Sequence, residues 1–426
     1  GITGNMNYMY DQRYALDFSF RMDGSSQFGS DKRFAPFWSV GLAWNVHREK
    51  FMKDKASFIN VLKLRGSVGN PGNQNFSSYS AITTYYFNNW MLNNFGTGVL
   101  VSKFGDPNLA WQRTLDKNIG INLSMFSNRF HVTVDFYHKR TDPLIADIGI
   151  PVSMGVEKRR TNIGVQVDKG VNGTIRYAIL YKPQESINYT MSVNFRYGTA
   201  FYKNIGRSLN AYNQENISKN LTRYYDGGSP TALWAVRSRG IDPATGQEIF
   251  VKKDGTLTYT FDYKDEVEVG DSRPTLEGVW GNTFYYKGWS ASLQLRYSFG
   301  ADVFNSTLFN KVENISSRSI TTNQDRRALY NRWKKPGDKA KFKSISLTES
   351  TPMSSRFVMK ENYLSIESVR LGYQFDSKWL KKALRISSLN INMYMNSIAR
   401  FSTLEDERGL YYPFARSISF SLGAIL

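Results

Sequence analysis

Stretches of about ten residues in which every second side chain is apolar or aromatic recur along this chain. Residues 288–300 show the pattern: Trp289, Phe299 and the alternate positions between them are apolar or aromatic, and the intervening residues are small or polar. A side-chain period of two indicates a β-strand. A tilted strand of this length crosses a bilayer, and such alternation with aromatic ends is typical of transmembrane β-barrels. We therefore expect an all-β chain, an antiparallel barrel that lies in an outer membrane.

Thirteen segments follow this pattern. They are residues 13–23, 37–46, 61–69, 79–87, 118–126, 130–139, 163–181, 188–198, 277–286, 289–299, 363–375, 384–396 and 417–426. Short and long connections alternate between them, which is typical of barrels with short periplasmic turns and long extracellular loops. Because successive strands must cross the membrane in alternating directions, one of the thirteen segments, residues 79–87, does not fit as a membrane strand. We expect this odd segment to be a hairpin arm inside an extracellular loop at residues 70–114. About twelve strands then span the membrane, with the charged stretch 47–60 in the periplasm.

Composition excludes several other classes of protein. The chain is 15% aromatic, yet its mean hydropathy is −0.44, and no run approaches the roughly 18 apolar residues of a membrane helix. Cysteine is absent, so neither a disulfide framework nor a thiolate metal site is expected. The chain carries no signal-peptide pattern and starts almost directly in strand-like sequence. We therefore expect it to be a piece of a longer protein.

The net charge of +19 has three interpretations. Basic charge with aromatics is found in nucleic-acid-binding proteins, but the basic residues here are spread over loops and polar strand faces without a nucleic-acid module, and we expect no nucleic acid. The charge is also consistent with solvated loops and a polar lumen. A third interpretation is that Lys and Arg attract anionic ligands or lipid phosphates. Charge alone does not choose between the last two.

Side chains in the long loops are the candidates for ligand contacts, because aromatics on membrane faces mostly contact lipid. The candidates for substrate binding are Trp90, Tyr224, Tyr225, Trp234, Arg237 and Arg239. The alternative is that these loops pack on one another or on a partner. The loop at residues 301–360 holds twelve Lys and Arg against five acidic residues. This excess favours an anionic substrate or an acidic partner face.

Catalytic and metal chemistry have little support in the sequence. The three histidines are His47, His131 and His138, and the last two lie seven residues apart on one expected strand, so they face opposite sides. The acidic run 405–407 lacks the residue order of a calcium-binding EF-hand loop. We expect no catalytic residue, no metal site and no cofactor, and hence no enzyme.

Short motifs that lie in a fixed order along nearly the whole chain carry a resemblance to a known family. They are RMDGSSQFG at 21–29, FAPF at 34–37, EKFMK at 49–53, LKLRGSVGN at 62–70, DPNLAW at 106–111, NRF at 128–130, DFY at 135–137, GIDPATGQE at 240–248, RW at 332–333, PGD at 336–338, YL at 363–364 and LGY at 371–373. In this order the chain resembles the C-terminal part of the SusC-like (RagA-like) TonB-dependent outer-membrane transporters of Bacteroidetes.

The resemblance implies a larger machine than these 426 residues. It implies a barrel of about 22 strands with an N-terminal plug, a TonB box, and a SusD-like surface lipoprotein that opens as a lid. Residues 1–426 would be the C-terminal portion of the barrel, with plug and TonB box absent from this chain. The implied activity is import of a nutrient, with TonB acting through the missing N-terminal part. An oligosaccharide is the first candidate for this nutrient and an oligopeptide is the second.

Two other classes of protein remain as alternatives. One is a passive porin or structural outer-membrane barrel, which would have no upstream plug or TonB box. The other is a β-rich surface binding protein, which salt or alkali would extract from the membrane, whereas an integral barrel needs detergent.

Overall fold

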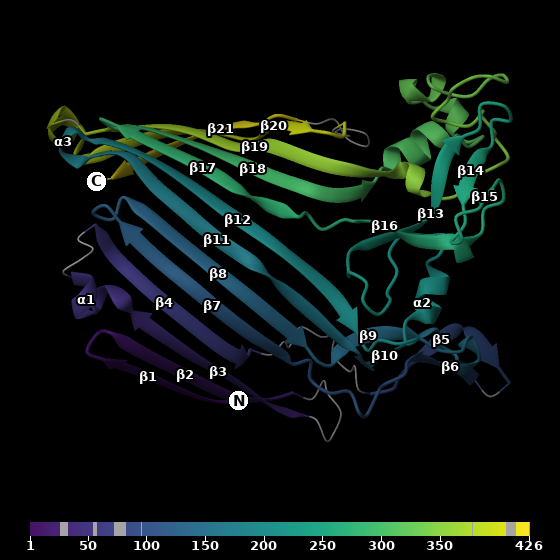
Figure 1. Ribbon diagram of the computed structural model, residues 1–426, viewed down its shortest axis with the longest axis horizontal. Coiled ribbons are helices and arrows are strands. Elements are labelled where there is room, and N and C mark those ends of the chain that lie inside the picture. Colours follow the sequence, from purple (N-terminus) through teal and green to yellow (C-terminus); the bar gives the residue numbers. More distant parts are fainter. Residues whose placement is uncertain are drawn as a thin grey trace.

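The computed structural model describes residues 1–25, 33–53, 58–71, 82–94, 96–376, 378–405 and 415–425. Its main element is an antiparallel sheet of 13 strands that follow one another in chain order (Figure 1). From edge to edge the strands are β1 (Ile2–Tyr10), β2 (Tyr14–Gly24), β3 (Phe34–Asn45), β4 (Ile59–Asn70), β7 (Thr114–Met125), β8 (Phe130–Thr141), β11 (Val165–Lys182), β12 (Ile187–Lys203), β17 (Leu276–Tyr286), β18 (Trp289–Phe304), β19 (Val358–Phe375), β20 (Ser388–Ser402) and β21 (Ile418–Ile425). Within the described ranges, the edge strands β1 and β21 each have one neighbour.

The two ends of this sheet differ. At one, which we call the turn end, tight turns join neighbouring strands, and α1 (Lys50–Lys53) and α3 (Lys378–Leu384) lie there as well (Figure 1). Lys287 and Gly288 connect β17 to β18 with φ of 43° and 88°. Two consecutive positive φ angles are what a two-residue type I′ hairpin requires. At the other end, the loop end, the connections are long and contain structure of their own.

Four smaller groups of elements occupy the loop end. One hairpin is β5 (Thr84–Asn93) with β6 (Gly96–Lys103), and another is β9 (Leu144–Gly149) with β10 (Lys158–Ile163). A separate sheet has the order β15 (Leu257–Thr258), β14 (Glu248–Val251), β13 (Ala232–Ile241) and β16 (Glu266–Asp271). The short helix α2 (Asn210–Glu215) lies beside them, and a turn of π-helix, η6 (Leu308–Glu313), and a 3₁₀ turn, η9 (Ser355–Phe357), lie in the connection from β18 to β19.

Cross-strand register separates the main sheet into two faces. One row runs from Leu42 through Gly66, Ile119 and Phe136 to Val171, on β3, β4, β7, β8 and β11. The next row consists of Gly41, Ser67, Asn118, Tyr137 and Gly170 on the same strands. We call the first the apolar face and the second the polar face. Leu42 and Ile119 are 60% and 67% exposed, so no described residue covers the apolar face at this row.

The polar face carries ion pairs that cross strands. Arg65 on β4 contacts Asp135 on β8 at 2.8 Å, and the pair passes over Gly120 of the intervening strand β7. A Cβ at Gly120 would lie 2.4 Å from the Asp135 carboxylate oxygen. A side chain at this position would displace the ion pair, and the arrangement fits a water-facing lumen.

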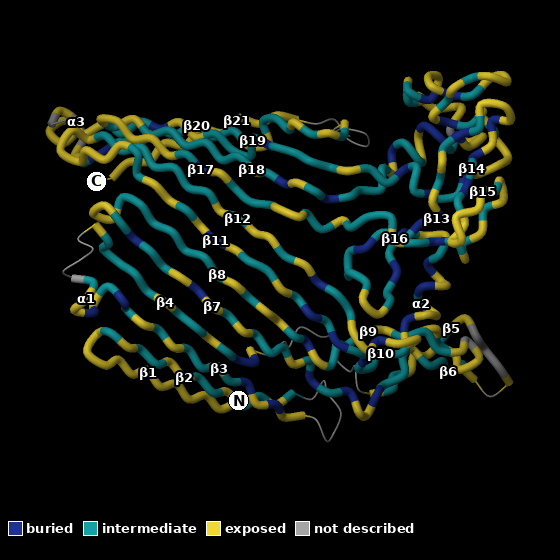
Figure 2. The backbone as a smooth tube through the Cα atoms, viewed as in Figure 1, coloured by how far each residue is buried: buried dark blue, intermediate teal, exposed yellow. Residues whose placement is uncertain are grey.

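Buried residues gather toward the loop end, as the dark segments of Figure 2 show. One cluster contains Phe37 and Trp111, whose rings lie 5.4 Å apart. A second contains Ile163, Ile205 and Leu209. The described helices include none that is long and apolar enough to span a membrane.

The expected strands are confirmed, with local differences. All twelve membrane segments are present, and β1 adds a thirteenth strand that the pattern did not predict. The odd segment is indeed a hairpin arm, β5, although residues 79–81 of it lie outside the described residues. The segment 163–181 is divided by Gly164, at φ 32°, into the end of β10 and the long strand β11. The segment expected to begin at residue 384 begins as β20 at Ser388, because α3 occupies the residues before it.

Candidate functional site

Two long connections pack together at the loop end. We call the β13 to β16 sheet together with residues 305–357 the loop-end assembly. Val236 of β13 bridges to Ser354, and the backbone N–H of Ser238 donates to Ser355 Oγ at 3.0 Å. The connection between β12 and β17 is therefore joined to the connection between β18 and β19.

Two of the sequence motifs meet in this assembly. The indole of Trp333 donates to the carbonyl of Pro243 at 2.9 Å and packs over Gly246. Gly246 has a φ of 73°, which favours glycine, and a Cβ there would lie 2.6 Å from the Trp333 ring. Backbone conformation and packing therefore both require glycine at this position. The backbone N–H of Gly337, in the PGD motif, donates to the same Pro243 carbonyl at 2.8 Å, so the GIDPATGQE turn and the RW and PGD motifs form one contact.

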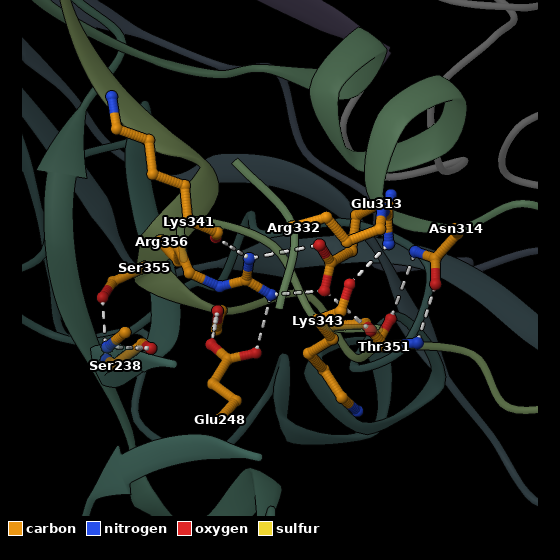
Figure 3. Close-up of polar contacts among 12 residues, drawn as sticks. Ser238, Glu248, Glu313, Asn314, Arg332, Lys341, Lys343, Thr351, Ser355 and Arg356 are labelled. Carbon is orange, nitrogen blue, oxygen red and sulfur yellow. Dashed lines mark hydrogen bonds and ion pairs between the residues drawn. The ribbon is translucent and has the colours of Figure 1, made fainter. Parts of the chain in front are cut away.

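A buried ionic cluster joins the same two connections (Figure 3). The guanidinium of Arg356 lies 3.0 Å from a carboxylate oxygen of Glu248 and 2.7 Å from one of Glu313. The two glutamate side chains are 1% and 0% exposed. Ser354 Oγ donates to Glu248 at 2.6 Å, and Thr351 Oγ1 donates to Glu313 at 3.1 Å. We call these three charged residues the Arg356 cluster.

The charges in this cluster are coupled to their surroundings. Burial alone would lower the pKa of Arg356, but hydrogen bonds and charge from Glu313 and Glu248 outweigh it, and the pKa is raised. Arg332 lies nearby and donates to the carbonyls of Ala328, at 2.8 Å, and Lys343, at 2.6 Å. Its pKa is lowered by burial, which Glu313 offsets only in part. Arg332 acts as a cross-link between backbone segments, and the cluster as a whole is structural.

A cavity of about 810 Å³ opens beside this cluster, at the loop end of β18, β19 and β20. Leu308, Phe342 and Phe357 form an apolar wall that continues the buried cluster below. Tyr330, Lys341 and the Arg327 to Glu405 ion pair, at 2.9 Å, give it a polar rim. Its size is that of a small-molecule site. This cavity could not be predicted from the sequence, because its lining comes from three separate connections.

Three of the six candidate residues are brought together. Tyr225 and Trp234 are in contact, with ring centroids 4.7 Å apart and 56° between the ring planes, and the neighbouring Tyr224 packs on Tyr202 and Tyr212. Arg223 anchors this segment through a buried ion pair with Glu266 at 3.0 Å. Burial raises the pKa of both Tyr224 and Tyr225. The indole N–H of Trp234 is buried and has no hydrogen-bond partner among the described residues.

The other three candidates lie apart from this pair. Arg237 and Arg239 are on β13 with Trp234, and both are exposed. Arg237 reaches the carbonyl of Lys252 at 3.5 Å, whereas Arg239 makes no hydrogen bond or ion pair within the described part of the chain. Trp90 lies on the β5 hairpin and is 97% exposed. The structure contains no ligand, so the roles of all six residues stay predictions.

Histidine and acidic groups form no metal site in the described ranges: no three His, Cys, Asp or Glu residues are grouped closely enough to hold an ion. His131 and His138 do lie on opposite faces of β8, since His131 pairs with Ser124 and His138 with Lys117 in an unbroken register. Of the acidic run 405–407, only Glu405 is among the described residues.

Comparison with known proteins identifies the family. Residues 1–315 match the family described as TonB dependent receptor-like, beta-barrel. Because this match covers well over half of the chain, the chain belongs to that family, whose members are integral outer-membrane transporters and receptors. The loop end of the sheet is accordingly the extracellular end and the turn end the periplasmic one.

Several relatives are similar over nearly the whole chain. TonB-dependent receptor P39 of Formosa agariphila is 27% identical over 452 residues, covering 95% of this chain and 42% of the relative. TonB-dependent receptor SusC of Bacteroides thetaiotaomicron is 25% identical, covering 99% of this chain and 43% of SusC. The RagAB peptide transporter superposes with a TM-score of 0.82 at 22% identity, over 94% of this chain and 43% of that one, and this likeness shows the fold. The chain spans about two fifths of the length of the curated relatives it matches.

Proposed function

We propose that this chain is the C-terminal barrel portion of a transporter that imports an oligosaccharide across the outer membrane with energy from TonB. The plug and the TonB box would belong to a part of the transporter outside these 426 residues. Family membership and the similarity to SusC support this proposal. The RagAB structure is that of a peptide transporter, and a peptide is the second candidate substrate.

The observation that carries the proposal of a sugar is the contact between Tyr225 and Trp234 at the loop end, whose ring centroids lie 4.7 Å apart. Aromatic rings provide large apolar surfaces on which a sugar can pack. The exposed Arg239, on the same strand as Trp234, would donate hydrogen bonds to the sugar hydroxyls.

Uptake by cells that carry the intact transporter tests this proposal. We expect uptake of labelled oligosaccharide to stop when a protonophore removes the energy for TonB, whereas a passive porin would continue to admit it. Trp234→Ala should weaken binding about tenfold, since a lost ring contact amounts to roughly 1.4 kcal/mol. Trp280→Ala, on the membrane strand β17, is the matched control. Peptide uptake with the same energy dependence and no sugar uptake would favour the second substrate.

We also propose a SusD-like lipoprotein as the extracellular lid. The β5 hairpin supports a docking partner, because Phe87 is 75% exposed and Trp90 is 97% exposed. Contiguous exposed apolar side chains on a soluble loop commonly mark interaction sites. A lipoprotein should co-purify with the transporter, and Phe87→Asp with Trp90→Asp should release it. Leu257→Asp, on the exposed strand β15, is the control that should leave the pair intact.

A further inference from the structure

A row of basic residues crosses the apolar face of the main sheet near its extracellular end. Lys117, His138 and Lys169 are register partners on the adjacent strands β7, β8 and β11. Directly paired residues have Cβ atoms about 5 Å apart. The next residues on this face toward the periplasm are Ile119, Phe136 and Val171, all apolar. The row therefore lies on the surface that faces lipid.

Among the described residues, this row has no opposite charge beside it on its own face. The acidic residues of these strands, Asp116, Asp135 and Asp168, lie on the polar face, where cations pair with them. Near the row, Arg140 pairs with Asp142 at the end of β8. In the described part of the chain, none of Lys117, His138 and Lys169 forms an ion pair, and all three are exposed. The Lys169 Nζ lies 5.8 Å from the centroid of the Phe201 ring.

An apolar groove of about 670 Å³ runs up to this row on the same face. Leu42 and Val40 of β3 form one wall, and Ile119 and Phe136 form the other. Gly66 of β4 is its floor, and a Cβ added there would have nothing within 4 Å. Lys117 and His138 close its extracellular end. The groove is thus apolar along its length and cationic at one end.

The height of the row agrees with a lipid headgroup. Lys117 lies eight residues along β7 from Met125, at the periplasmic end of the strand. At about 3.3 Å per residue, this is roughly 26 Å along the strand. A strand tilt of about 40° turns this into roughly 20 Å along the membrane normal, near the top of an apolar band about 25 Å tall. The row is therefore placed where phosphates of the outer leaflet begin.

We propose that this groove and row form a binding site for one phosphate-bearing lipid of the outer leaflet. An acyl chain lies along Gly66 between the walls, and the phosphate accepts hydrogen bonds from Lys117, His138 and Lys169. Isolated lysines on a barrel also extend toward headgroups, but they do so without a groove that ends on them. The site is on the outside of the barrel and does not depend on which nutrient the transporter carries.

Native mass spectrometry of the intact transporter tests the site, with phosphatidic acid and phosphatidylcholine as probes in separate titrations. The unmodified transporter should retain one phosphatidic acid in preference to phosphatidylcholine. The variant Lys117→Gln, His138→Gln, Lys169→Gln should weaken this adduct at least about tenfold, because each cation near the membrane surface contributes on the order of a fivefold gain in affinity. Gly66→Leu should also weaken it, since the leucine fills the groove and leaves the cations in place.

A matched control lies on the polar face. Lys63, His131 and Arg176 are on β4, β8 and β11, and their replacement by Gln removes the same kinds of charge without touching the row. Heat-modifiable migration on a gel verifies that each variant is folded. An adduct that survives either the cation variant or Gly66→Leu overturns the proposal, and so does an equal loss in the control. Displacement of the lipid by an equimolar amount of inorganic phosphate would show a simple anion site and also overturn it.

Discussion

Replacing Arg356 by Met should loosen the loop-end assembly while leaving the barrel folded. The replacement removes the one guanidinium that contacts both Glu248 and Glu313, whose side chains are 1% and 0% exposed. Removing one partner of a buried pair costs about 3–5 kcal/mol, because the remaining charge is left without compensation. We take about 4 kcal/mol, because Ser354 and Thr351 still donate to the two carboxylates.

Hydrogen exchange of the intact transporter in detergent measures this loss directly. The amides of Lys341, Phe342 and Trp333 donate to carbonyls within residues 331–342, and their protection reports local opening. A loss of about 4 kcal/mol corresponds to an increase of roughly a thousandfold in their exchange rates. Amides of β7 and β8, in the main sheet, should exchange as before and serve as the internal reference.

Two further variants determine whether charge is the cause. Combining Arg356→Met with Glu248→Gln and Glu313→Gln removes all three charges, and protection should recover to within about 1–2 kcal/mol of the original, since neutral replacements of buried ion pairs are often tolerated. Glu405→Gln removes the exposed pair with Arg327, since the Glu405 side chain is 71% exposed, and leaves the Arg327 pair with Asp325 in place; it should change exchange by less than about fivefold. Protection in Arg356→Met within fivefold of the original would refute the reasoning.

Three other outcomes are expected. Burial would raise the pKa of Asp106, but hydrogen bonds from Thr161, Asn108 and Arg159 outweigh it and hold this pKa below its ordinary value of 3.8. The contact of residues 104–111 with β10 should therefore be lost as pH falls through the lowered pKa. Pulsed hydrogen exchange at pH 5 and pH 2 checks this, and Asp106→Asn should show the loss at both pH values. Gly278→Ala should destabilise the barrel by about 1–3 kcal/mol in a urea titration, because the new Cβ would lie 1.9 Å from the Asn194 carbonyl oxygen, and Gly66→Ala is the control with open space. Trp234→Phe should weaken oligosaccharide binding less than Trp234→Ala, because it keeps an aromatic ring in contact with Tyr225.

The membrane strands could be predicted because one sequence property determines them. Each has lipid on one face and water on the other, and a period of two follows directly from that. β1 was missed because Gly4 interrupts its apolar positions and several polar residues stand between them. The sheet β13 to β16 was missed for another reason: β14 has four residues and β15 two, which is too short for a period to be recognised.

The candidate site could be predicted only in part. Large aromatics in long loops are visible in a sequence, and Tyr225 and Trp234 do meet. The Arg356 cluster was not visible, because Glu248 and Arg356 are 108 residues apart and their types do not distinguish a buried pair from solvated loop charges. The nearest signal was the motif GIDPATGQE, whose last residue is Glu248. Contacts of this kind are set by tertiary packing, which periodicity does not report.

The two edges of the main sheet have a consequence for how such a barrel is assembled. β1 presents one side of its backbone to a neighbour and β21 does the same at the opposite edge, so in the described part of the sheet each leaves a row of N–H and C=O groups without a strand beside it. Water can solvate such a row, but hydrocarbon cannot, and each unsatisfied group there costs several kcal/mol. Insertion and pairing of the two edges must therefore be nearly simultaneous: β1 and β21 gain their place in lipid only once each has a strand beside it, and until then the open edges are the surfaces on which a chaperone or insertion machine can act.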